Sequence, residues 1–366
     1  MGKTYKITMI AIFIIPLIAF SLLLLLTDDR DFSESENRVL QTMPEFSTYG
    51  LFKGKYTKTF ETYISDQFPF RDSFVAGKTM LDKSMLKKEG NGVYFGDNGY
   101  LLQKINTPSE STMDKAVNNI LAMKKEGYKI STLFIPSSAL VYNNLLPKYV
   151  DPEKENDSLD YLKNSLSGKV NNIELRNDLI GERDNYLYYR TDHHLTSRGS
   201  YRVYRSYMDS INRPSHNIAD YRIEDASNSF YGSLYSKVID ISLSPDTINL
   251  YHLKNSKDRY RVTRDGKVYN DIYFRERLKE KDKYKVFLND NYPYLKITGN
   301  QKASEDLVII KDSYANSIIP FLLDHYRSIH VVDPRYYNTG MKDVLESINC
   351  KKLLYIFSLE NINFIK

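Results

Sequence analysis

The chain has 366 residues, of which 42% are hydrophobic and 27% charged, and this composition excludes a disordered chain, a collagen-like repeat and a multi-span membrane protein. The net charge of +5 comes from 51 basic and 46 acidic residues spread along the sequence, which does not indicate a nucleic-acid-binding protein. A single cysteine, Cys350, excludes an internal disulfide and a zinc site built from thiolates.

An uncharged run of 20 residues, Ile7 to Leu26, lies near the N-terminus. As a helix it would span about 30 Å, the thickness of the hydrocarbon core of a bilayer. Lysines precede the run and aspartates follow it, so residues 1–6 are expected in the cytoplasm and the rest outside it. A cleaved signal peptide is the alternative, but its apolar region is normally shorter, and no small-residue cleavage site follows Leu26. We therefore expect a single-pass, uncleaved anchor in the cell membrane.

The polar stretch over residues 27–50 predicts a linker or an arm. Helical spacing follows over residues 51–65 and 73–88. Next, Asn98-Gly99 lies between two short apolar runs, which is the pattern of a β-hairpin. We expect one extracytoplasmic domain over residues 51–366.

Helical and buried-strand patterns alternate through much of this domain. Helices are expected at 111–126, 160–166, 197–211, 316–325 and 341–349, and strands at 128–135, 170–175, 307–310, 329–332 and 353–357. This alternation predicts a mainly parallel sheet with helices on both faces and a working site at the carboxyl ends of the strands. Residues from 212 to about 300 break the pattern, so we expect an insertion of hairpins and loops there.

Ser313 follows one of these strands, at the point where the chain turns into a helix. A serine at such a corner projects from the sheet, and the free N–H groups of the helix can stabilise an oxyanion, as in a nucleophile elbow. The simpler explanation is that Asp312 or Ser313 caps the following helix, and this explanation is favoured when the stretch is taken alone.

The second reactive stretch contains Asp192, His193 and His194. In an extended segment, residues two apart face the same way, so Asp192 can hold the imidazole of His194 in one tautomer while His193 points to the opposite side. A metal site is the competing chemistry, but no HExxH motif or second acidic-histidine cluster supplies further ligands, so we expect no metal. Packing or hydrogen bonding is the interpretation for the remaining histidines: His216, His252, His325 and His330.

Several segments, taken in order along the chain, resemble a known family. They are SENRVLQTMPEFS (35–47), FETYISDQFPFRD (60–72), GVYFGDNGYLLQ (92–103), FIPSSALVYNNLLP (134–147), TDHHLTSRGSY (191–201), KDSYANSIIPFLLDHY (311–326) and HVVDPRYYN (330–338). Together with the N-terminal apolar run, they resemble the DHHW family of bacterial proteins. That family is related to the AlgX/AlgJ-type alginate O-acetyltransferases and, more distantly, to the SGNH hydrolase superfamily.

The resemblance implies an SGNH-like three-layer α/β/α sandwich with a serine–histidine–aspartate triad. Asp192 and His194 match the D-x-H pair of the acetyltransferase relatives, and Ser313 matches their nucleophile. Two departures are visible. Leu195 stands where the DHHW signature has tryptophan, and Lys311 stands where many relatives carry glycine.

The other candidate site residues are less specific. The backbone N–H of Ser313 is the leading candidate for an oxyanion donor, and Asn361 is a weaker one. Tyr314 follows the nucleophile in the matching motif and is a candidate substrate-binding residue. Arg335 and Tyr336, at the end of another expected strand, either line the site or cap a surface loop.

The resemblance implies a membrane-anchored extracytoplasmic O-acetyltransferase that modifies a cell-surface or secreted polysaccharide through an acyl-serine, with no cofactor. Because acetyl-CoA is absent outside the membrane, it also implies a membrane-bound O-acyltransferase as the acetyl donor. Two alternatives stay open. One is a carbohydrate acetyl-esterase with the same triad, and the other is a non-catalytic polysaccharide-binding subunit of an acetylation or secretion complex.

Overall fold

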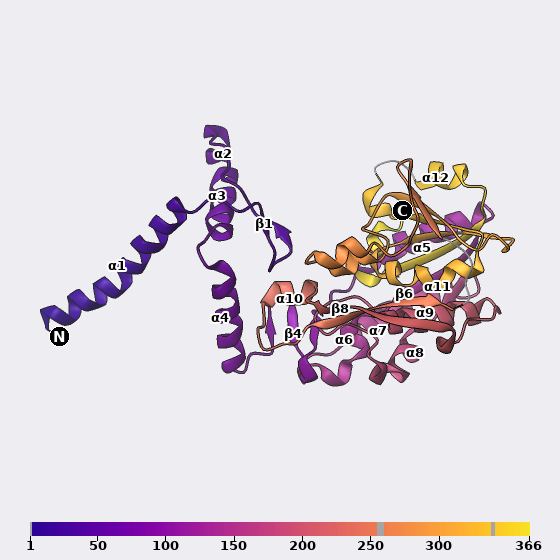
Figure 1. Ribbon diagram of the computed structural model, residues 1–366, viewed down its shortest axis with the longest axis horizontal. Helices are drawn as coiled ribbons and strands as arrows, with labels where there is room; N and C mark the ends of the chain where they lie inside the picture. Colours follow the sequence, from indigo (N-terminus) through magenta and orange to yellow (C-terminus); the bar gives the residue numbers. More distant parts are fainter. Residues whose placement is uncertain (1, 255–259, 338–340) are drawn as a thin grey trace. The chain divides into compact units, whose positions relative to one another are not determined.

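The computed structural model describes residues 2–254, 260–337 and 341–366. The chain divides into two compact units, which are drawn in Figure 1. The helical unit comprises residues 1–87 and 236–242, and the sheet unit comprises residues 88–235 and 243–366. The division after Lys87 lies later in the chain than the boundary predicted at residue 51, because the helices before Lys87 pack on one another and on the N-terminal arm.

The helical unit begins with the predicted apolar helix. Over Thr4–Leu26 this helix has a mean hydropathy of 3.0 and is long enough to cross a membrane, and a signal sequence has the same properties. The elements of this unit are α1 (Lys3–Leu26), β1 (Phe32–Ser33), β2 (Arg38–Val39), α2 (Thr48–Phe52), α3 (Lys55–Asp66) and α4 (Arg71–Ser84). Gly54 adopts a left-handed conformation, with φ of 71°, and separates α2 from α3.

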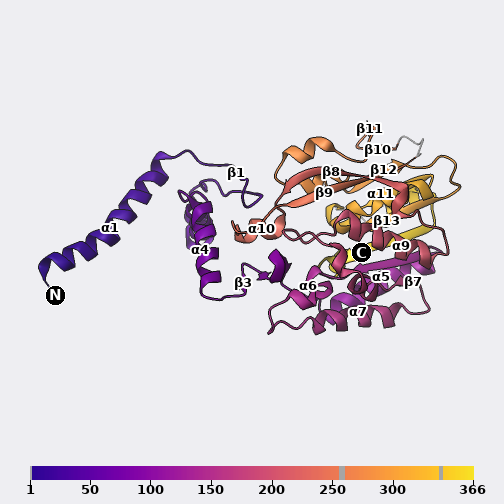
Figure 2. The ribbon, with the colours of Figure 1, turned by 60° about the horizontal axis from the view of Figure 1, so that its bottom comes forward.

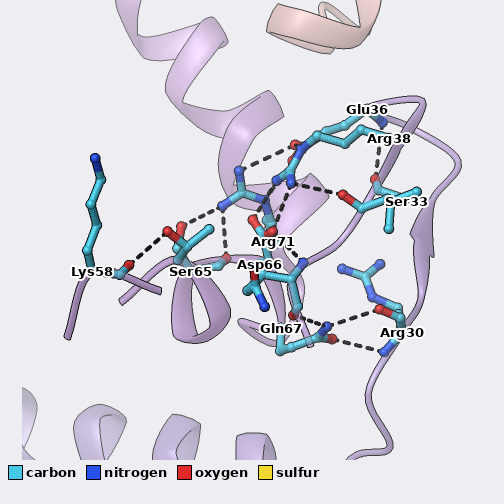
Figure 3. Close-up of polar contacts among 12 residues, drawn as sticks. Arg30, Ser33, Glu36, Arg38, Lys58, Ser65, Asp66, Gln67 and Arg71 are labelled. Carbon is cyan, nitrogen blue, oxygen red and sulfur yellow. Dashed lines mark hydrogen bonds and ion pairs between the residues drawn. The ribbon is translucent and has the colours of Figure 1, made fainter. Parts of the chain in front are cut away.

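The arm after α1 is held against α3 and α4 by ion pairs (Figure 3). The guanidinium of Arg38 donates two hydrogen bonds to the carboxylate of Asp66, at 2.5 and 2.8 Å. Glu36 accepts from Nε of Arg38 and from Nε of Arg71, both at 2.6 Å. These contacts fix the arm at the corner between α3 and α4.

A mainly parallel sheet forms the centre of the sheet unit, with the strand order β11-β10-β12-β14-β13-β15-β6-β7. The five strands from β14 to β7 are parallel, and β12, β10 and β11 extend the sheet in antiparallel pairs. The strands are β6 (Lys129–Ile135), β7 (Asn171–Ile173), β10 (Arg261–Arg264), β11 (Lys267–Tyr269), β12 (Tyr294–Thr298), β13 (Asp306–Lys311), β14 (Ser328–Val332) and β15 (Lys352–Ser358).

Helices cover both faces of this sheet (Figure 2). One face packs on α5 (Glu110–Lys125), α7 (Glu153–Leu166) and α12 (Met341–Ser347), and the other on α6 (Ser138–Val141), α8 (Arg176–Gly181), α9 (Ser197–Ser210) and α11 (Ile319–Leu322). Successive residues of β13 point to opposite faces of the sheet. Leu307 and Ile309 pack in the core on the α9 side, while Val308 and Ile310 pack in the core on the α5 side. The predicted three-layer α/β/α architecture is confirmed.

The region from 212 to 300 is more closely joined to the sheet than the sequence predicts. Hairpins are present, since β8 (Tyr221–Phe230) and β9 (Asp246–Leu253) form an antiparallel ribbon. The strands β10, β11 and β12, however, belong to the central sheet. The alternation of apolar and polar residues in these strands is short. In β12 only Leu295 and Ile297 are buried, and two apolar positions do not distinguish a strand of the central sheet from a surface hairpin.

Two other local predictions have clear outcomes. The hairpin at Asn98-Gly99 is confirmed, since β4 (Val93–Phe95) pairs antiparallel with β5 (Leu101–Gln103), and β3 (Glu89–Gly90) pairs with β4. The single helix predicted over 316–325 is wrong. Short 3₁₀ turns and α11 replace it, because Pro320 lacks the N–H that would continue a helix through this position.

Candidate active site

Ser313 is the second residue beyond the carboxyl end of β13, a strand that lies between its parallel neighbours β14 and β15. Asp312 caps the 3₁₀ turn Ser313–Ser317, since its Oδ1 accepts from the backbone N–H of Tyr314 at 3.0 Å. The capping role therefore belongs to Asp312, and the hydroxyl of Ser313 remains available for another partner. Ser313 is half-buried, whereas Asp312 and Tyr314 are buried.

Asp312 also ties this corner to the end of β15. Its Oδ2 accepts from the backbone N–H and the hydroxyl of Ser358, at 2.9 and 2.8 Å, and from the amide of Asn361 at 2.9 Å. The side-chain N–H groups of Asn361 are thus directed at Asp312 and Ser358. Asn361 therefore supports the corner that carries Ser313, which is a different task from the oxyanion contact that the sequence offers as an interpretation.

Ser313, His194 and Asp192 form one hydrogen-bonded chain. Oγ of Ser313 lies 2.9 Å from Nε2 of His194, and Nδ1 of His194 lies 2.6 Å from Oδ1 of Asp192. The same carboxylate accepts from the backbone N–H of His194 at 2.9 Å and from that of Ser233 at 2.6 Å. An ionised Asp192 requires the proton on Nδ1 of His194, which leaves Nε2 able to accept from the serine.

Electrostatics keep Asp192 ionised. Burial alone would raise the pKa of this carboxyl, but the neighbouring imidazoles of His193 and His194 and two hydrogen bonds outweigh burial and hold the pKa well below its usual range. An ionised carboxylate at this position stabilises a positive charge on His194.

His193 does not point to the opposite side as the sequence predicts. Its ring lies 3.8 Å from the ring of His194, because the chain bends from Arg190 to His194 instead of running extended. Nδ1 of His193 lies 2.6 Å from Oγ of Ser233. The site therefore contains two serine–histidine contacts, and the carboxylate is 2.6 Å from Nδ1 of His194 but 3.7 Å from Nδ1 of His193.

Two tyrosines surround His194. Tyr284 stacks on the imidazole with 3.8 Å between ring centroids and an interplanar angle of 9°, and its hydroxyl donates to the backbone carbonyl of Ser313 at 3.0 Å. The ring of Tyr314, a candidate from the sequence, lies 5.2 Å from His194 at 56°. Tyr284 comes from the region 212–300 and has no motif around it, so no sequence signal pointed to it.

Two further residues of that region position the loop that carries Asp192. A Cβ at Gly232 would lie 2.2 Å from Cβ of Asp192, so only glycine fits at this close approach. Asp246 accepts from the backbone N–H groups of Arg190 and Thr191, at 3.0 and 2.8 Å, and burial raises its pKa. Gly232-Ser233 is a turn signal in the sequence, but nothing there connects it with Asp192.

Lys311, Asp333 and Arg335 form a charge cluster next to the corner that carries Ser313. Nζ of the buried Lys311 lies 3.1 Å from Oδ2 of Asp333, and the guanidinium of Arg335 donates two hydrogen bonds to the same carboxylate. Burial lowers the pKa of Lys311 despite this carboxylate. Within the described residues no hydrogen bond or ion pair joins Arg335 or Tyr336 to the triad, and Tyr336 is half exposed.

Asp192, His193 and His194 also offer possible metal ligands, since one atom of each lies within 4.8 Å of the others. Both ring nitrogens of His194 are already engaged, one with Asp192 and one with Ser313. An ion at this cluster would have to break one of these hydrogen bonds. The donor set is therefore arranged for proton transfer.

The family model described as "DHHW protein" matches residues 87–332, more than half of the chain. The chain belongs to the DHHW family. A DHHW family protein from Eubacterium siraeum is 22% identical, with a TM-score of 0.63 over 75% of this chain and 93% of that chain. PatB1 of Bacillus cereus, solved with a sulfonyl adduct, is 22% identical, with a TM-score of 0.64 over 75% and 98% of the two chains.

The O-acetyltransferase domain of Pseudomonas putida AlgJ is similar at 13% identity, with a TM-score of 0.45 over 74% of this chain and 92% of that chain. No curated protein sequence matches the chain. The Eubacterium siraeum protein and PatB1, with TM-scores of 0.63 and 0.64, show that the DHHW protein described here shares their fold.

The signature of this DHHW protein reads Asp192-His193-His194-Leu195. Leu195 is fully buried in the hydrophobic core and its backbone bridges to Tyr188. The tryptophan of the signature is thus replaced by a core leucine, and Tyr284 supplies an aromatic face to His194.

Proposed function

We propose that this DHHW protein is a membrane-anchored, extracytoplasmic O-acetyltransferase that acetylates a polysaccharide hydroxyl through an acyl-serine at Ser313. The observation that carries the proposal is the hydrogen-bonded chain from Oγ of Ser313 through His194 to Asp192, with distances of 2.9 and 2.6 Å. The apolar helix near the N-terminus supports an anchor, and the motifs shared with acetyltransferase relatives support acetyl transfer.

In the first half of the proposed reaction, Oγ of Ser313 attacks the carbonyl carbon of an acetyl donor while Nε2 of His194 takes the hydroxyl proton. Asp192 stabilises the imidazolium without taking the proton. The backbone N–H of Ser313 has no acceptor among the described residues and is our candidate to bind the oxyanion. The C–O bond to the donor then breaks, and the leaving oxygen takes the proton from His194.

In the second half, a sugar hydroxyl gives its proton to Nε2 of His194 and attacks the acetyl-serine. The C–O bond to Ser313 breaks, the proton returns to Oγ, and the acetylated sugar leaves. Outside the cell membrane the donor is proposed to be a membrane-bound O-acyltransferase that carries acetyl groups across the bilayer. Water in place of the sugar would make the same triad an esterase.

The test uses the full chain in lipid nanodiscs with a chromogenic acetyl ester, with and without oligosaccharides of amino sugars and uronic acids. We expect acetyl groups on an oligosaccharide, an acyl-enzyme by intact mass, and loss of both in Ser313→Ala. Acetate release that no sugar diverts would support the esterase instead. Equal activity of wild type and Ser313→Ala would contradict a catalytic role for Ser313.

A further inference from the structure

The corner between α3 and α4 carries an open apolar groove of about 860 Å³ in the helical unit. We call it the corner groove, and its apolar lining residues are Phe60, Ile64, Phe68, Phe74 and Val75. Phe74 is 51% exposed, and Phe70, at the corner itself, is 67% exposed. Exposed aromatic groups gathered in this way indicate a binding surface and not a solvated helix face.

The backbone at Phe70 gives a second indication. Its φ of 58° and ψ of 25° lie in the left-handed region, where a bulky side chain is disfavoured and glycine or asparagine is usual. Strained residues of this kind tend to occur at functional positions. The phenyl group of Phe70 is exposed on this strained backbone, so its role is expected at a surface that binds another group.

Hydrogen bonds join the corner to the residues that directly follow α1. The hydroxyl of Tyr63, on α3, donates to Oδ1 of Asp29 at 2.9 Å. Oε1 of Gln67 accepts from the backbone N–H of Arg30 at 2.9 Å, and its amide donates to the carbonyl of Arg30 at 3.0 Å (Figure 3). Asp29 and Arg30 are the third and fourth residues beyond α1, so the end of α3 lies beside the exit of the apolar helix.

Aromatic contacts also join the corner to a residue of α1 that lies well before the end of this helix. The ring of Phe20 lies 5.3 Å from the ring of Phe68 and 5.7 Å from that of Phe74. Phe20 precedes the last residue of α1 by six positions, about 9 Å along the helix axis. If α1 crosses a bilayer, Phe68 and Phe74 therefore contact it at a depth where its other neighbours are lipid chains.

We propose that the corner groove is a membrane-contact surface, filled by acyl chains of the bilayer that α1 spans. This inference rests on the anchor in the proposed function. The contacts of Phe20 support lipid as the occupant, because the apolar helix that would lie among acyl chains packs directly on Phe68 and Phe74.

The chain contains no tryptophan, so a single introduced tryptophan reports on its own position. The reporter is Phe70→Trp in the full chain, reconstituted in vesicles of zwitterionic and anionic phosphatidyl lipids that carry bromine near the headgroup end or near the methyl end of the acyl chains. Phe13→Trp, within α1, is the control for insertion, and Tyr149→Trp, on an exposed residue of the sheet unit, is the control for water.

We expect bromine near the headgroup end to quench Phe70→Trp at least half as strongly as bromine at its best depth quenches Phe13→Trp, and to leave Tyr149→Trp unquenched. Absence of quenching at Phe70→Trp, with Phe13→Trp quenched, would overturn the inference and leave the anchor intact. Absence of quenching at Phe13→Trp would overturn the anchor itself. A blue-shifted Phe70→Trp that bromine does not quench would show that protein, such as a second copy, covers the corner beside the groove, and would also overturn the inference.

Discussion

Two neighbouring histidines contact serines in this site, and the geometry around them assigns different roles. His194 lies between Asp192 and Ser313, so a proton accepted from the serine generates an imidazolium that the carboxylate stabilises. His193 uses Nδ1 for Ser233, and Asp192 is 3.7 Å from that nitrogen. The contact between His193 and Ser233 therefore orients the loop, while the contact between His194 and Ser313 is suited to catalysis.

Gly232 provides a sharp test of how closely Asp192 must be held. In Gly232→Ala the new Cβ would lie 2.2 Å from Cβ of Asp192, so the carboxylate has to move. A displacement of about 1 Å at a catalytic group lowers the rate by roughly 100-fold, and we expect a fall in kcat/KM of that order for acetyl-ester cleavage.

The matched control is Gly181→Ala in α8, where a Cβ would meet no atom within 4 Å. We expect its kcat/KM to equal that of the wild type. Full activity in Gly232→Ala would show that the position of Asp192 is not critical.

At the scale of single residues, the sequence predicts the proposed reacting groups better than the residues that position them. Asp192, His194 and Ser313 belong to short motifs whose spacing carries chemical meaning. Tyr284, Gly232 and Asp246 act through contacts with residues 29 or more positions away, or by leaving space, and such contacts leave no local pattern. The bend that turns His193 beside His194 also depends on these distant contacts.

Among the elements, β13 and β14 each present a charge at their carboxyl ends. Lys311, the last residue of β13, is buried 3.1 Å from Oδ2 of Asp333, which directly follows β14. Asp333 also pairs with a second cation, since a guanidinium nitrogen of Arg335 lies 2.7 Å from its Oδ2. Among the described residues, Nζ of Lys311 contacts only this one carboxylate and donates its other hydrogen bond to the side-chain carbonyl of Asn291. The two partners of this ion pair are therefore not equivalent.

We expect Asp333→Asn to lower the free energy of unfolding by about 3–5 kcal/mol, because it leaves Lys311 buried without a counter-charge. Lys311→Met leaves Asp333 paired with Arg335, so its cost should be clearly smaller. Denaturant unfolding of both full-length variants decides this. An equal loss in the two variants would mean that the cluster stabilises the fold through the pair as a whole.

The order of elements follows from the sequence because helical and strand periods differ clearly over long segments. The strands β10, β11 and β12 are exceptions, since three to five residues carry too little periodicity to distinguish a strand of the central sheet from a surface hairpin. Pro320 lies inside the range predicted as one helix, and in the structure it stands in the first turn of α11, where its missing N–H is tolerated.

For the molecule as a whole, His325 links stability to pH. Burial, together with the nearby His216, lowers the pKa of His325 from 6.5 to about 4. Between these two values the unfolded chain binds a proton that the folded chain does not. Stability from this group is therefore complete above pH 6.5 and falls as the pH drops towards 4.

We expect the free energy of unfolding of the wild type to fall more steeply between pH 6.5 and pH 4 than that of His325→Gln, with a difference of about 1–3 kcal/mol. Glutamine keeps a partner for the hydroxyl of Tyr204, which lies 2.6 Å from Nε2 of His325. Parallel pH profiles for the two proteins would contradict a depressed pKa at His325.

The central claim is that Ser313 is the nucleophile, and sulfonylation of the full chain tests it most directly. A sulfonyl fluoride transfers its sulfonyl group to an activated hydroxyl and releases fluoride, and PatB1, which shares the fold, was solved with a sulfonyl adduct. Peptide mapping after reaction should find the adduct on Ser313 and none on Ser233, with no adduct on either serine in His194→Ala. An adduct on Ser233, or unchanged labelling in Ser313→Ala, would contradict the account.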